Sequence, residues 1–143
     1  MPILAAGLGV LGGVGGAFVG GSVANEGQRE GFKRQRAAAM QDLRIEAYAN
    51  FLGTAEGLVG GYAAGSTDAE RRTAFVKLLS AKARVLILQE NPDVGNAAYE
   101  VATAITGDGR PKNRSHRQEL ADYKAAAEAF VALARHEISE SER

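Results

Sequence analysis

The stretch MQDLRIEAYANFLGTAEGLVGGY, residues 40–62, decides the fold class. Its apolar residues recur at spacings of three and four, which places them on one face of an α-helix. The pattern predicts a long helix from about Gln28 to Ala64 that buries this face against other helices. The residues of the stripe are Met40, Leu43, Ala47, Tyr48, Phe51, Leu52, Ala55, Leu58, Val59 and Tyr62.

Glycines interrupt the second half of this predicted helix. Gly53, Gly57 and Gly61 are spaced by four residues, and glycine weakens a helix interior by about 1 kcal/mol relative to alanine. Two interpretations are open: the row marks a close crossing with another helix, or the helix frays after Leu52.

A second helix is predicted from a capping signal. Thr67 with Glu70 three residues later fits a capping box, in which each residue bonds to the backbone of the other. Apolar residues then continue to about Glu90 and are dense near the end of the segment. We therefore expect this segment to be the central helix of the core.

Two further helices follow. Asn91 before Pro92 is typical of a helix start, and Gly107 of a helix end. Ser115 with Gln118 is a second capping-box candidate and opens a final helix that runs to 138.

The predicted fold is all-α, with an N-terminal glycine-rich transmembrane helix followed by a small antiparallel bundle of about four helices. Short connections make sequential helices neighbours in such a bundle. Four regions are expected: a transmembrane anchor (1–25), a basic juxtamembrane segment (26–36), the helical bundle domain (37–138) and a disordered tail (139–143).

The anchor is predicted from the absence of charge. Residues 1–25 carry no charged side chain, and 3–24 is a run of apolar residues and glycine interrupted only by Ser22. At about 1.5 Å per residue this run can span a hydrocarbon core of roughly 30 Å. Residues 7–12 also match the G-x-G-x-x-G pattern of dinucleotide-binding loops. No pattern of alternating strands and helices surrounds them, so we reject a nucleotide site.

Small residues form rows along this segment. Rows of glycine let two helix backbones approach closely, which favours helix association in lipid. The expected contact residues are Gly9, Gly12, Gly13, Gly16, Gly20 and Gly21. Two other interpretations are open: a lone anchor without a partner, and a secretory signal cleaved after 22–24.

Basic residues directly follow the apolar run. Arg29, Lys33, Arg34 and Arg36 lie after it and no basic side chain lies before it. The positive-inside rule then predicts a protein of the bacterial inner (cytoplasmic) membrane with its C-terminal domain in the cytoplasm.

Two basic clusters are candidate contact sites for anionic lipid or a protein partner. The first comprises Arg29, Lys33, Arg34 and Arg36; the second comprises Arg110, Lys112, Arg114 and Arg117. The first is explained equally well as a determinant of topology. The second is a solvated loop in the simplest interpretation, with anionic lipid, an acidic protein patch or nucleic acid as alternatives.

Catalytic chemistry has little support in the sequence. Cysteine is absent, and the only two histidines, His116 and His136, are twenty residues apart, so neither a thiolate site nor a helical His pair can form. No nucleophile-elbow or phosphate-loop motif occurs. Acidic and basic residues are equal at 17 each, so net charge does not point to nucleic acid. We predict no enzymatic activity, no cofactor and no metal.

The anchor and the first long helix resemble a known group of proteins. A glycine-rich apolar N-terminus, a basic flank and the segment RIEAYANFL (44–52) are similar to small, uncharacterised actinobacterial and phage-associated single-pass membrane proteins. Those proteins share an R-x-E-x-Y-x-x-F-L helix, here carried by Arg44, Glu46, Tyr48, Phe51 and Leu52. The resemblance covers residues 3–60. It implies an anchor and a bundle, and no activity or active-site residue.

Together these patterns predict a small bitopic membrane protein whose cytoplasmic bundle serves as a protein-interaction or scaffolding module. Membrane lipids, an unidentified protein and a second copy of the chain are the expected partners; nucleic acid is not. The alternative is a membrane-active protein, holin-like or toxin-like, that oligomerises through its glycine-rich helix.

Overall fold

The computed structural model describes residues 26–107 and 113–141. These residues form four α-helices and no strand, which confirms the predicted all-α helical bundle. The helices are α2 (Glu26–Ala63), α3 (Asp68–Leu88), α4 (Pro92–Thr106) and α5 (His116–Ser141). The predicted anchor and its glycine rows lie outside the described residues. No helix within the described ranges is long and apolar enough to cross a membrane.

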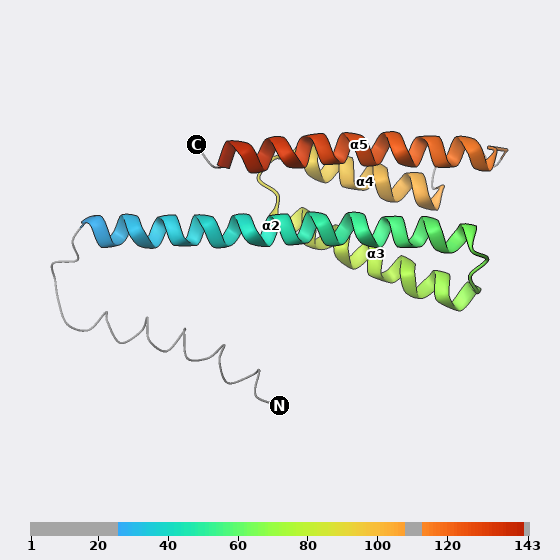
Figure 1. The fold of residues 1–143 in the computed structure, drawn as a ribbon, viewed down its shortest axis with the longest axis horizontal. Coiled ribbons are helices and arrows are strands. Elements are labelled where there is room, and N and C mark those ends of the chain that lie inside the picture. Colours follow the sequence, from blue (N-terminus) through green and yellow to red (C-terminus); the bar gives the residue numbers. More distant parts are fainter. Residues whose placement is uncertain (1–25, 108–112, 142–143) are drawn as a thin grey trace, which may run out of the picture. The chain divides into compact units, whose positions relative to one another are not determined.

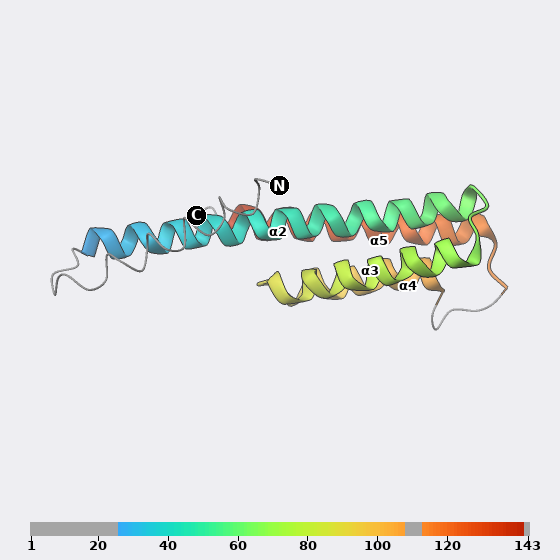
Figure 2. The ribbon, with the colours of Figure 1, turned by 90° about the horizontal axis from the view of Figure 1, so that it is seen from below.

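The chain divides into two units, Met1–Arg36 and Ala37–Arg143. In the first unit, the described side chains from 27 to 36 are all exposed to solvent. The second unit contains the bundle, an up-down-up-down arrangement in which the α2–α3 hairpin lies beside the α4–α5 hairpin (Figure 1). In the view turned by 90°, α2 lies next to α5 and α3 next to α4 (Figure 2).

The predicted caps are present and set the helix boundaries. Thr67 and Glu70 form a reciprocal capping box at the start of α3. The Glu70 carboxylate accepts hydrogen bonds from the backbone N–H and the hydroxyl of Thr67, and these lower its pKa, with the backbone N–H as the larger cause. At the start of α5, Ser115 and Gln118 exchange the same pair of contacts, at 3.0 and 3.3 Å.

α4 has both predicted ends. The Asn91 side chain accepts a hydrogen bond from the Asp93 backbone N–H at 3.0 Å, and Pro92 occupies the first turn. Gly107 ends the helix at φ 70°, a left-handed conformation that glycine adopts without a steric penalty. α5 continues to Ser141, three residues into the segment expected to be a disordered tail.

α2 extends over almost the whole range predicted for it, and neither open interpretation of its glycine row holds at Gly53 or Gly57. The helix does not fray after Leu52 but continues to Ala63, and a Cβ atom placed on Gly53 or Gly57 would meet no other described part of the chain within 4 Å. These two glycines therefore do not mark a close crossing with another described helix.

α3 is not the central helix of the core. It buries only Leu78, Ala81 and Val85, whereas α4 buries seven residues along its length. Most of those on α4 are small, so its neighbours can approach its backbone closely. The buried residues of α4 are Val94, Gly95, Ala97, Ala98, Val101, Ala102 and Ala104.

Three aromatic rings join α2 to α5. Phe130 of α5 is fully buried and packs edge-on against Tyr48, with ring centroids 5.7 Å apart, and against Phe51 at 5.2 Å. Such pairs add about 0.5–1.5 kcal/mol to the free energy of burying the rings. This contact holds the first and last helices of the bundle together.

Replacing Phe130 by alanine is expected to lower the free energy of unfolding by about 3–5 kcal/mol, because it removes a buried ring and leaves a cavity beside two others. Phe32→Ala is the matched control: that ring is 45% exposed, and its loss should change the value by no more than about 0.5 kcal/mol. The free energies of unfolding of both variants are measured by guanidinium denaturation, monitored by circular dichroism. Equal effects of the two substitutions would contradict the assignment of Phe130 to the core.

Candidate functional site

A cluster of polar side chains lies at the connection between α3 and α4, at one end of the bundle. The last carbonyls of a helix have no partner within the helix and need one elsewhere. Arg44 of α2, only 7% exposed, donates from Nε to the Leu88 carbonyl at 2.7 Å and pairs through its guanidinium with Glu90. A charged side chain from one helix thus closes the C-terminus of another.

Glu137 of α5 is the second buried charge, at 5% exposure. Its Oε1 accepts hydrogen bonds from the backbone N–H groups of Glu90 and Asn91, the latter at 2.8 Å, and its Oε2 accepts one from the Tyr48 hydroxyl. These contacts satisfy both carboxylate oxygens, as a buried charge requires.

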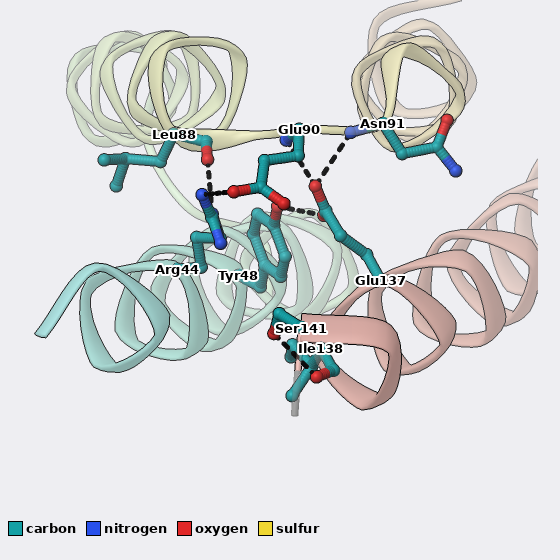
Figure 3. Close-up of polar contacts among 8 residues, drawn as sticks. All are labelled: Arg44, Tyr48, Leu88, Glu90, Asn91, Glu137, Ile138 and Ser141. Carbon is teal, nitrogen blue, oxygen red and sulfur yellow. Dashed lines mark hydrogen bonds and ion pairs between the residues drawn. The ribbon is translucent and has the colours of Figure 1, made fainter. Parts of the chain in front are cut away.

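The cluster connects all four helices of the bundle. Figure 3 shows Arg44 and Tyr48 from α2 and Glu137 from α5 converging on the chain segment that links α3 to α4. Burial, followed by the hydrogen bond to Glu137, raises the pKa of Tyr48 far above the ordinary value for tyrosine. The hydroxyl therefore remains a hydrogen-bond donor at neutral pH.

The hydrogen bonds of this cluster join side chains of α2 and α5 to the connection between α3 and α4. Neither of the two grooves described below is lined by Arg44, Tyr48 or Glu137. Within the described part of the chain, no group of acidic and histidine side chains is arranged to hold a metal ion.

A second feature of interest is an apolar surface on α3, which we call the α3 face. It consists of Val76, Leu79, Ala83, Leu86 and Ile87, all exposed, with Ile87 at 80%. Val76 and Ala83, like Leu79 and Leu86, are seven residues apart, the repeat by which one helix packs along another. The buried residues Leu78, Ala81 and Val85 lie on the opposite side, so α3 is apolar on two sides.

The charges on α3 around this face are basic. The helix has no acidic residue after Glu70, whereas Arg72, Lys77, Lys82 and Arg84 lie along it. Lys82 lies over the ring of Tyr99 at 5.2 Å from its centroid. Arg84 forms an ion pair with Glu46 of α2 at 3.3 Å. The α3 face therefore combines an apolar centre with a positive border.

A shallow groove of about 570 Å³ runs between α4 and α5, and we call it the α4–α5 groove. Its floor is mostly alanine and its rim is acidic. The acidic residues are Asp93 and Glu100 from α4 and Asp122 from α5, the last of which forms an ion pair with Arg114. The floor consists of Ala97, Ala125, Ala126, Ala129 and Leu133.

A smaller groove of about 410 Å³ lies at the other end of α4, beside Gly107 and His116. Tyr123 borders it, and burial, with a lesser contribution from the charge of Glu56, raises the pKa of its hydroxyl. The hydroxyl has no hydrogen-bond partner among the described residues.

The first basic cluster lies on the surface of α2. Arg29, Lys33, Arg34 and Arg36 are all exposed on α2, with Arg34 4.0 Å from Glu30. Their predicted contacts with lipid or a partner stay a prediction.

In the second cluster, Arg114 pairs with Asp122 while Arg117 is exposed. Arg110 and Lys112 lie outside the described residues. The cluster as a whole is therefore not assembled into one described surface.

The two histidines are exposed and lie beside acidic neighbours on α5. His116 Nδ1 is 3.9 Å from a Glu119 carboxylate oxygen, and His136 Nε2 is 3.5 Å from Glu140. Each pair is local to its own turn, and both histidines lie on the protein surface.

Sequence reasoning missed Glu137 and the role of Arg44. The available signal was a charged residue on an apolar stripe: Arg44 is one turn before Tyr48, and Glu137 is seven residues after Phe130. A charge in such a position needs a buried partner, but the sequence does not name it.

The described residues form a small up-down-up-down four-helix bundle. It contains the buried polar cluster of Arg44, Tyr48 and Glu137, which we call the polar junction, and it carries the exposed α3 face and the acidic α4–α5 groove. Comparison of the chain with protein-family models, with curated proteins and with solved structures found no match.

Glu137→Gln is expected to lower the free energy of unfolding by about 1.5–3 kcal/mol, because an amide offers one acceptor oxygen where the carboxylate offers two and loses the charge. Glu140→Gln, on the same helix but exposed, should have almost no effect. A double-mutant cycle with Tyr48→Phe should give a coupling of about 0.5–3 kcal/mol. Strict additivity of the two substitutions would contradict a direct bond between these side chains.

The stability of the protein should fall at alkaline pH. The pKa of Tyr48 is raised in the folded state, so the unfolded chain loses this proton first as the pH rises above about 10. The stability associated with the neutral hydroxyl is complete below that pH and is lost as the pH rises toward the folded pKa. The unfolding free energy of Tyr48→Phe should decline less steeply with pH over this range. An identical slope for both proteins would show that Tyr48 titrates normally.

Proposed function

We propose that this protein is a membrane-anchored interaction module that presents its helical bundle to a protein partner on the cytoplasmic side of the membrane. The observation that carries the interaction role is the α3 face. Five exposed apolar residues there continue along one side of a helix whose opposite side is already packed in the core. Contiguous exposed apolar surface of this kind is typical of an interaction site.

The anchor is supported by the sequence. Residues 3–24 are uncharged and long enough to span a bilayer, and the basic residues from Arg29 to Arg36 follow directly. Their exposure on α2 leaves these side chains free to meet anionic headgroups. The glycine rows of the same segment favour association of two anchors in lipid.

The buried junction supports a binding role rather than a catalytic one. Its two buried charges, Arg44 and Glu137, are used to hold helices together. The bundle is thereby a rigid support for surfaces on its outside, as an interaction module needs.

The proposal predicts that the full chain remains in membranes washed with carbonate and keeps its full mass. Leu11→Lys combined with Val14→Lys should release it, because a charge at the bilayer centre costs about 2.5–3.5 kcal/mol per residue. The matched control is Ala37→Lys with Ala38→Lys, two exposed positions of α2, which should stay in the membrane fraction. Fractionation with intact-mass measurement distinguishes the outcomes.

Release of the unaltered chain at full mass would contradict the anchor. A recovered chain beginning near Asn25 would instead identify the segment as a cleaved signal and would equally overturn the proposal.

A further inference from the structure

The α3 face and the α4–α5 groove have complementary chemistry. The face is apolar with a basic border, and the groove has an alanine floor with an acidic rim. Within one chain they cannot meet, because both belong to the same packed bundle and α3 is held to the core by its opposite side. A contact between them requires two molecules.

We propose that the α3 face of one molecule docks into the α4–α5 groove of a second copy of this chain. This inference rests on the proposed role of the α3 face as an interaction surface and names its partner.

The dimensions of the two surfaces agree. The α3 face extends from Val76 to Ile87, and the α5 side of the groove from Asp122 to Leu133. Each covers eleven residue steps, about 16 Å at 1.5 Å per residue. The alanines of the floor leave room for the larger Leu79, Leu86 and Ile87 side chains, which is the usual way a helix lies in a groove.

Charge selects this partner over a symmetric pairing of two α3 helices. Lys77 and Lys82 border the face, and α3 has no acidic residue after Glu70, so two such faces would bring like charges together. In the groove, the same lysines meet the exposed carboxylates of Asp93 and Glu100. The contact joins two different surfaces, so the arrangement is head-to-tail. In a pair of molecules, one α3 face and one α4–α5 groove therefore remain unoccupied.

Disulfide capture in membranes tests the proposal with the full chain. The protein has no cysteine, so single cysteines can be introduced without background. Leu79→Cys on the α3 face and Ala129→Cys in the groove, each with its own tag, are coexpressed and oxidised. In the control pairs, a chain with Ala49→Cys, a position exposed on α2, takes the place of the Leu79→Cys chain or of the Ala129→Cys chain. The expected result is a disulfide-linked Leu79–Ala129 pair at about ten times the yield of either control pair.

Charge reversal tests the border independently. Lys77→Glu in the Leu79→Cys chain should reduce the captured pair about tenfold, and Glu100→Lys in the Ala129→Cys chain should restore it. Lys124→Glu is the matched control, because Lys124 is exposed on α5 and does not line the groove. It should leave capture unchanged.

Two results would overturn the proposal. Dominant Leu79–Leu79 pairs would show that α3 pairs with itself, and equal yields from all cysteine positions would show collision rather than docking. In either case, the proposed function is tested separately by retention of the full chain in carbonate-washed membranes.

Discussion

The arrangement of the bundle depends on one carboxylate. Glu137 approaches the α3–α4 connection from α5 and bonds to two consecutive backbone N–H groups while also accepting the Tyr48 hydroxyl from α2. Removing a carboxylate from water costs free energy, and hydrogen bonds offset this cost only if both carboxylate oxygens have partners. The connection, α2 and α5 must therefore lie in one arrangement. Arg44 imposes the same requirement from α2 through the Leu88 carbonyl.

The sequence predicted the parts of this fold that depend on local interactions. The capping box at Thr67, the Asn91–Pro92 start and the Gly107 end were all predicted, since each uses partners within a few residues. The polar junction was not predicted. Glu137 and its backbone donors are 46 and 47 residues apart, and a backbone N–H leaves no mark in the sequence.

The prediction for α3 failed for a related reason. Apolar spacing reveals that a helix has an apolar side but not which side is buried when it has two. The density of apolar residues near Leu86 and Ile87 suggested a central position, yet these are among the exposed ones. The short, alanine-rich α4 takes the central position instead, because its small side chains allow close packing.

The two apolar sides of α3 also have a consequence for folding. A helix of this kind can collapse onto the rest of the chain in two ways, related by a half-turn about its own axis, and the side left outside carries the larger residues. Hydrophobic burial alone does not favour the native choice, so a wrongly rotated α3 would compete with the native packing if burial were the only force. The half-turn would move the Leu88 carbonyl away from Arg44 and the chain beyond it away from Glu137. The hydrogen bonds of the two buried charges form in only one rotation of α3 about its axis. They therefore favour the native orientation, which hydrophobic burial alone does not distinguish.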